Sequence, residues 1–455
     1  MPDPASASAA SATRSGSADE GLVRAMGVRE LAATIFNIMV GGGIFVLPAV
    51  AAAHMGARAP VAYVVCALAA GLVVLCFAEA GSRVSLTGGP YAYVGVAFGP
   101  FAGFLAGVLL WTLLVFASAA VASALVASAA VFWPALAQPA LRALLLVLVL
   151  AAVAAVNVRG VRSGARLVEL VTVAKLLPLL LLVAAGFFVT PAPAAPGAAP
   201  AGDLGRTVVI LFFAFAGVEG ALTPSGEVRH PERTVPRALG MAMLLVTALY
   251  IAIQLVSQRA LGVAALAAAG EAPLAAVAAR IAGRPGAVLL AAGAVISMFG
   301  GVSGIGLAAP RALYAMGRDG FIPLVSRPLG SIHPQYRTPH VAIVTQAAIV
   351  AALAVTSGFA RLAVLANVAV LTLYLVCALA VLELRRRDVR TGGGVPFRVP
   401  GGPLIPVAAA AVIVWILLHA TVRELTVVAG VLAGAALFFV LSAPSRRAAA
   451  SPDDP

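Results

Sequence analysis

Charged side chains are scarce in this chain of 455 residues: they make up 10% of it, whereas hydrophobic residues make up 62%. An ordinary soluble domain carries about 25% charged residues, so the composition excludes that class. The apolar segments are long and lack strict alternation, which favours membrane-spanning helices over an outer-membrane barrel. We therefore expect an all-α, polytopic membrane protein.

The residue types that build catalytic and metal sites are also few, with three cysteines and five histidines. They are Cys66, Cys76, Cys377, His54, His230, His333, His340 and His419. No CxxC or CxxH spacing occurs and the histidines are scattered, so we expect no metal, no cofactor and no enzymatic activity. Repeated rings of polar residues, which an ion channel needs, are lacking as well.

Basic residues are plentiful, and the net charge is +13. The arginines lie in short loops without interleaved aromatics, so they do not predict nucleic-acid binding. Most of them fall on one side of the predicted membrane, and the positive-inside rule then places both termini in the cytoplasm of a cell-membrane protein. The predicted spans are 28–53, 59–81, 100–131, 139–157, 165–189, 205–223, 235–258, 286–310, 339–357, 361–383, 403–420 and 424–442.

The polar segments are predicted to lie outside the membrane. Residues 1–22 are rich in Ser and Ala and lack the pattern of a signal peptide, so we expect a disordered cytoplasmic tail. Residues 190–204 form an external Pro/Ala-rich loop, and residues 443–455 form a second cytoplasmic tail. A short helix near 274–281 is expected within the external segment 260–284.

Three consecutive glycines, Gly41, Gly42 and Gly43, interrupt the first predicted span, and Pro48 follows them. Each glycine costs roughly 1 kcal/mol in a helix interior, and close helix packing needs small residues only four positions apart. Local unwinding is therefore favoured over a packing role. Unwound backbone at membrane depth is tolerated where it lines a cavity, and its free N–H groups suit a carboxylate.

The sixth predicted span contains Gly217, Gly220 and Pro224, together with an acid, Glu219. Breaks in the first and sixth spans occupy matching positions in two five-span halves, 23–189 and 205–385. Two additional spans follow in 386–442. Interrupted helices at corresponding positions are the best sequence indication of a transporter substrate site.

Three motifs resemble those of the amino acid–polyamine–organocation (APC) superfamily. They are GGGIFVLPA (41–49) in the first span, FFAFAGVEGALTPSGEVRHPERTVPRAL (212–239) in and after the sixth, and APRALYAMGRDGFIP (309–323) after the eighth. The matches occur in the family's order and cover nearly the whole chain. The resemblance implies the LeuT-type fold, with two inverted five-span repeats plus two extra helices, and transport of amino acids or related amines by alternating access.

The resemblance also implies a substrate site between the two breaks. The N–H groups that bind the amino acid carboxylate match Gly41, Gly42 and Gly43, beside Ile44. The carbonyl groups that meet the amino group match Met39, Val40, Phe213, Ala214 and Ala216, beside Gly217. Phe213 also matches the aromatic that gates the pocket, and Ile305 of the eighth span is expected to line it. Gly42 replaces the usual serine, so a side-chain hydroxyl contact is lost.

The single lysine of the chain, Lys175, lies inside an apolar run. An ionisable group inside a membrane span suggests a functional role. The alternative is a structural lysine whose side chain extends to the membrane interface, known as snorkelling. Several APC relatives have a fifth-span lysine in the place of a sodium ion. For Lys175 this implies contacts with carbonyls near Val40 and with Ser297 or Ser303, and either proton coupling or a permanently charged brace.

The remaining acids have two interpretations each. Glu219 is either an acceptor for N–H groups of the broken sixth helix or a proton carrier. Glu227 with Arg233 or Arg237 is either an inner gate or a solvated pair. Glu79, beside Arg83, is expected to form a solvated ion pair.

The sequence therefore predicts proton-coupled symport of a neutral amino acid. An amino acid exchanger and a sodium-coupled symporter stay as alternatives. The expected partners are the amino acid, protons and the lipid bilayer. The sequence does not indicate the oligomeric state.

Overall fold

The computed structural model describes residues 27–84, 89–159, 165–192, 202–222, 228–270, 272–318, 326–391 and 395–441. Within these ranges the regular elements are helices, with no β-strand, which confirms the all-α prediction. Helices are the expected outcome, because each one satisfies its own backbone hydrogen bonds in lipid. The predicted tails 1–22 and 443–455 lie outside the described residues.

Each predicted span contains helix. The corresponding elements are α2 (Val28–Met39) with α3 (Gly43–Met55), α4 (Ala59–Arg83), α6 (Pro100–Ala129), α7 (Pro139–Arg159), α8 (Ala165–Gly186), α9 (Leu204–Leu211) with α10 (Val218–Ala221), α11 (Pro231–Leu261), α13 (Pro273–Arg318), α15 (His340–Thr356), α16 (Phe359–Arg386), α17 (Leu404–Leu418) and α18 (Val422–Leu441). Seven helical stretches in the described ranges are long and apolar enough to cross a membrane by themselves. The full set of crossings and the inverted repeat stay predictions.

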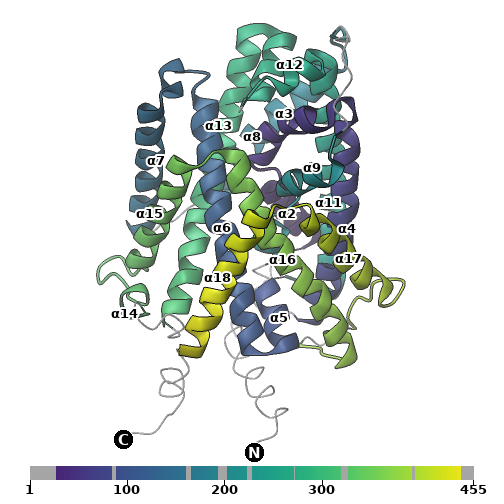
Figure 1. Cartoon of the computed structure of the whole chain (residues 1–455), viewed down its shortest axis with the longest axis vertical. Coiled ribbons are helices and arrows are strands. Elements are labelled where there is room, and N and C mark those ends of the chain that lie inside the picture. Colours follow the sequence, from purple (N-terminus) through teal and green to yellow (C-terminus); the bar gives the residue numbers. More distant parts are fainter. Residues whose placement is uncertain are drawn as a thin grey trace, which may run out of the picture.

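The long helices run side by side in one bundle (Figure 1). In the most apolar stretches of α6 and α16, 67% and 78% of the residues are buried, whereas the corresponding shares are 22% in α7 and 11% in α18. α6 and α16 are therefore central, and α7 and α18 are peripheral. The peripheral helices expose apolar side chains, as expected of helices that contact lipid.

Three α-helices of the described ranges lie between predicted spans and were missed: α5 (Pro90–Phe98), α12 (Val263–Ala267) and α14 (Ser326–Leu329). α5, the longest of them, packs against α6 and α16, and it starts at a proline and ends before a glycine. Gly89 and Gly99, on either side of it, have positive φ values of 55° and 90°. A proline at the first helical position and a glycine just past the end are typical helix boundaries, so this signal was present in the sequence.

α13 contains both the short helix predicted near 274–281 and the eighth predicted span. A kink separates the two parts, because Ala282 and Gly283 leave the helical φ/ψ region. Gly283 has a φ of 64°, which a residue without a Cβ adopts at little cost. The second part continues to Arg318 and thus extends beyond the predicted end at residue 310.

Candidate functional site

The first predicted span is broken where the glycines lie. α2 ends at Met39, α3 starts at Gly43, and residues 40–42 between them are not helical. The Gly41 N–H donates to Met39 O at 2.8 Å, whereas the N–H groups of Gly42 and Gly43 have no backbone acceptor among the described residues. Unwinding is thus confirmed, and it leaves free donors at the N-terminus of α3.

The sixth predicted span is broken as well. After α9 the chain makes a 3-10 turn, Phe212–Ala214, and α10 starts only at Val218. Gly217 precedes α10 with a φ of 114°, a left-handed conformation that side chains with a Cβ rarely adopt. Pro224 lies outside the described residues.

The two breaks lie against each other. A Cβ on Gly217 would stand 2.9 Å from Ile38 Cγ2, and a Cβ on Gly43 would stand 3.1 Å from the Phe213 ring and 3.4 Å from Ala214 Cα. Both glycines therefore permit a close approach of the two broken helices. Phe213, the predicted gate, is half-buried here, and its ring also packs edge-on against Phe359 of α16, with 5.5 Å between ring centroids.

A tyrosine that the sequence analysis missed joins the two breaks. The Tyr250 hydroxyl of α11 donates to Met39 O at 2.6 Å and to Ala214 O at 3.0 Å, and the residue is fully buried. A hydroxyl has one proton, so the two carbonyls share it. The sequence held a signal, because a tyrosine in the middle of an apolar span needs a partner for its hydroxyl.

Lys175 of α8 is 5% exposed and reaches the first break. Its Nζ donates to Val40 O at 3.0 Å and to Asn37 O. The snorkelling alternative is wrong, because the ammonium binds carbonyls at the break and not the interface. The expected contact near Val40 is present, and its role in coupling stays a prediction.

The two serines of the eighth predicted span, Ser297 and Ser303, do not hydrogen-bond to Lys175. The buried Ser297 hydroxyl has no hydrogen-bond partner among the described residues, and no hydrogen bond links Lys175 with Ser303. Both serines lie on α13, where Ile305 is half-buried. Their places in a substrate or coupling site stay predictions.

Glu219 supports the second break. The Gly217 N–H lies 3.1 and 3.0 Å from its two carboxylate oxygens, and the Tyr374 hydroxyl of α16 donates to it. This geometry matches the first interpretation, an acceptor for N–H groups of the broken helix. Asn367, also on α16, donates to Val209 O at 2.6 Å and thus caps the end of α9.

The predicted gate pair does not come together in the described residues. Glu227 lies outside them. Arg233 is exposed in the first turn of α11, where its backbone N–H donates to His230 O at 2.9 Å. The gate interpretation therefore stays a prediction.

The expectation of a solvated pair at Glu79 is wrong. Glu79 is 0% exposed and Arg83 1% exposed. The Glu79 carboxylate accepts from Arg83 Nε at 3.1 Å, from Arg385 Nε at 2.7 Å and from the Val399 N–H at 2.9 Å. Arg385, at the end of α16, and the segment around Val399 cover this end of α4, which removes the pair from solvent.

One further acid lies at the edge of this cluster. Asp388 stands 3.7 Å from Arg83 Nη1 and accepts a hydrogen bond from Arg390 at 2.7 Å. The bond from Arg390 lowers the pKa of the Asp388 carboxyl below its ordinary value. Asp388 is therefore ionised at neutral pH and adds a negative charge beside Arg83.

Comparison with known proteins identifies the class. A family model described as amino acid permease matches residues 26–444. The chain belongs to the amino acid permease family. It is 26% identical to the serine/threonine exchanger SteT of Bacillus subtilis, over 86% of this chain and 90% of that protein.

Other relatives of this permease have different names. It is 27% identical to the methylthioribose transporter of Bacillus subtilis, over 94% of this chain and 95% of that protein. It is 25% identical to the branched-chain amino acid permease BcaP of the same organism, over 89% of each. The family is one of multi-pass membrane transporters, and the substrates named for these relatives differ.

Proposed function

We infer that this permease is a secondary active transporter that carries a neutral amino acid between the two broken helices. The observation that carries the proposal is the contact of the breaks, which brings backbone groups of opposite polarity together. The N–H groups of Gly42 and Gly43, at the positive end of α3, suit a carboxylate. The carbonyls of Met39 and Ala214 suit an ammonium, which takes over as donor from the Tyr250 hydroxyl.

A neutral side chain fits this site better than a cationic one. Glu219 is the acid nearest to the second break in sequence, and its oxygens already accept from the Gly217 N–H and the Tyr374 hydroxyl. A substrate ammonium would have to displace these donors. The relatives named for serine and threonine or for branched-chain amino acids are consistent with a neutral substrate.

The contacts of Lys175 support proton coupling. A charged ammonium ties α8 to the carbonyls of Asn37 and Val40, and a neutral amine releases at least part of that tie. Protonation and the position of the first broken helix are therefore linked. A sodium ion is disfavoured next to this ammonium, because the two cations repel each other.

Exchange is the second candidate function, and the similarity to a protein named as an exchanger favours it. In that mechanism Lys175 stays charged and acts as a brace. The LeuT-type arrangement has two inverted five-span repeats in the cell membrane and both termini in the cytoplasm, and it is compatible with either mechanism.

Uptake of labelled serine, threonine and leucine into proteoliposomes tests the proposal. Uptake driven by an inwardly directed proton gradient without sodium supports symport. Uptake that needs internal amino acid and ignores the proton gradient supports exchange. Absence of both, with protein that binds none of the amino acids, would refute amino acid transport through this site.

The variant Lys175→Ala separates the coupling proposal from the substrate proposal. We expect it to lose uptake driven by a proton gradient. Amino acid binding at the two breaks, measured by scintillation proximity, reports separately on the substrate site. Proton-driven uptake at the wild-type rate would refute the role of Lys175 alone.

A further inference from the structure

A groove of about 480 Å³ lies between α7 and α15, away from the two breaks. This volume is within the range of about 300–1,000 Å³ that is typical of small-molecule pockets. Four of its alanines, Ala151, Ala155, Ala348 and Ala351, lie on the two facing helices. Because their side chains are short, the helices leave an open channel on a face that lipid covers.

The groove is polar at one end only. Val147 and Val344 are aliphatic parts of its wall, whereas Arg159 is the last residue of α7 and Tyr336 lies in the segment between α14 and α15. Arg159 is exposed and makes no hydrogen bond or ion pair with the described residues. The groove therefore matches a molecule with a long apolar part and an anionic head.

The polar end is held in place by the backbone around it. The Thr338 hydroxyl donates to Val158 O at 2.6 Å, which ties the segment before α15 to the end of α7. The Tyr336 N–H donates to His333 Nδ1 at 3.2 Å, and the His333 N–H donates to Thr338 O at 2.8 Å. The backbone at Tyr336 is thus held at the end of the groove that Arg159 also lines.

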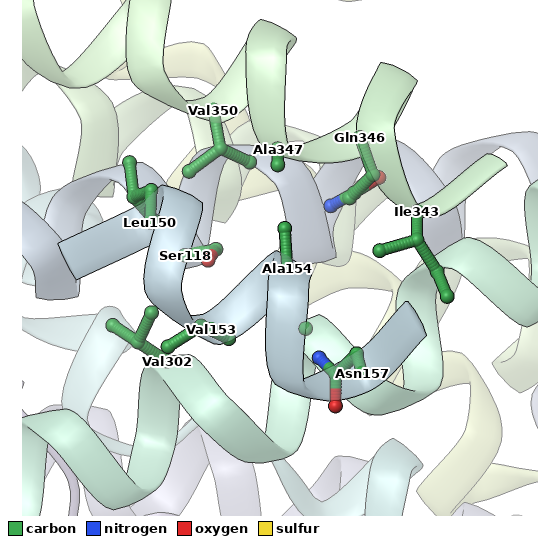
Figure 2. A pocket seen from close by; sticks show the side chains of 11 residues that line it. Ser118, Leu150, Val153, Ala154, Asn157, Val302, Ile343, Gln346, Ala347 and Val350 are labelled. Atoms are coloured by element: carbon green, nitrogen blue, oxygen red, sulfur yellow. The ribbon is translucent and has the colours of Figure 1, made fainter. Parts of the chain in front are cut away.

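Hydrogen-bond donors lie behind the alanine wall. A small inner cavity of about 20 Å³ shares Leu150, Ala154 and Ala347 with the groove. Figure 2 shows Asn157 and Gln346 on two helices around this cavity. Both are more than nine-tenths buried, and Asn157 Nδ2 and Gln346 Nε2 have no acceptor among the described residues.

We propose that this groove binds one anionic glycerophospholipid. An acyl chain lies along the alanine wall, and the phosphate pairs with Arg159 and the Tyr336 hydroxyl, while the amide groups at the inner cavity stay behind that wall. Arg159 lies on the predicted cytoplasmic side, where the leaflet is rich in anionic lipid. A free phosphate would leave the apolar part of the groove unfilled, and a neutral lipid would leave Arg159 without a counter-charge.

Native mass spectrometry of the full-length protein, titrated with phosphatidylglycerol or phosphatidylcholine, tests the proposal. We expect one phosphatidylglycerol to bind more tightly than phosphatidylcholine. Because a basic residue near an anionic surface contributes about 1 kcal/mol, Arg159→Gln should weaken phosphatidylglycerol binding about fivefold. Arg237→Gln is the matched control, since Arg237 is also an exposed arginine but lies near the start of α11, outside the groove.

A second pair of variants tests the apolar part. Ala151 and Ala152 are neighbouring, exposed alanines of α7, and only Ala151 lines the groove. We expect Ala151→Phe to weaken binding of both lipids and Ala152→Phe to leave it unchanged. Equal binding by Arg159→Gln and the wild type, or by the two phenylalanine variants, would overturn the proposal. A dimer that only Ala151→Phe disrupts would also overturn it, because a second copy would then occupy the groove.

Discussion

Replacing Glu79 with glutamine is expected to destabilise the fold through the charges that it leaves behind. Gln is close to Glu in size and still accepts the hydrogen bond from the Val399 N–H, so packing changes little. The substitution removes the negative charge that faces Arg83 and Arg385, which are 1% and 18% exposed. Asp388, at 3.7 Å from Arg83, is then the nearest carboxylate in the cluster.

Breaking a buried ion pair by removing one partner costs about 3–5 kcal/mol, because the other charge stays buried. With the average unfolding entropy per residue, a chain of 455 residues converts this into a fall in Tm of roughly 3–5 °C. The matched control is Glu383→Gln. Glu383 pairs at 2.8 Å with Arg386, which is 76% exposed, so solvent replaces the lost interaction.

Thermal unfolding of the two variants in one detergent, followed by intrinsic tryptophan fluorescence, measures the difference. We expect the Tm of Glu79→Gln to lie several degrees below that of the wild type and the Tm of Glu383→Gln to equal that of the wild type. Equal Tm values for the two variants would refute the reasoning, because Glu79 would then be as well solvated as Glu383. The double variant Glu79→Gln, Arg385→Gln should recover part of the loss, since it removes one of the unpaired charges.

Three further substitutions test the breaks. Lys175→Arg keeps a cation that does not lose its proton, so proton-driven uptake should fall while exchange persists; preserved proton-driven uptake would contradict coupling through this residue. Tyr250→Phe removes the hydroxyl that Met39 O and Ala214 O share; Met39 O keeps the Gly41 N–H, whereas Ala214 O loses its donor, at a cost of about 1–3 kcal/mol, so Tm should fall. Because the substrate ammonium takes over from this hydroxyl, amino acid affinity should not fall, and weaker binding would contradict that replacement. Gly217→Ala places a Cβ 2.9 Å from Ile38 on a residue in a left-handed conformation, and it should reduce uptake. Gly220→Ala is the control, because its Cβ would meet open space, and it should leave uptake unchanged. Equal uptake by the two variants would contradict the close approach of the breaks.

The breaks themselves were predictable because their causes are local. Gly41–Gly43 weaken the first helix by their own conformational freedom, and the position of Gly217 with its φ of 114° is one that glycine favours. Neither conclusion needs a contact with another part of the chain. The same holds for the all-helical fold, which follows from long apolar segments in lipid.

The side chains that complete the breaks were harder to predict, because their partners are distant in sequence. Tyr250 and Met39 are 211 residues apart, and Tyr374 and Glu219 are 155 apart. The contact of Lys175 with Val40 was expected only through a resemblance to known permeases. A single sequence shows that a polar side chain in a span needs a partner, but not which backbone group supplies it.

Glu79 shows how burial can reverse a local interpretation. Glu79 and Arg83 are four residues apart on one helix, the spacing of an ordinary surface pair. The residues that bury them come from the far end of the chain, with Arg385 306 positions away and Val399 320 positions away. The sequence near Glu79 does not indicate either of these partners.

The choice of lysine at position 175, in a chain whose other basic residues are arginines, follows from the contact geometry. The Lys175 ammonium is compact and fits between two carbonyls of one broken helix, Asn37 O and Val40 O. A guanidinium is wider, and its five donors would need more acceptors than this buried site offers. A lysine also loses its proton far more readily than an arginine in such surroundings. The site therefore favours lysine for its shape in either mechanism, and shape alone does not distinguish a brace from a proton carrier. In Lys175→Arg the exchange activity is therefore the control that shows whether the wider cation is tolerated, and loss of proton-driven uptake counts as loss of coupling only where exchange persists.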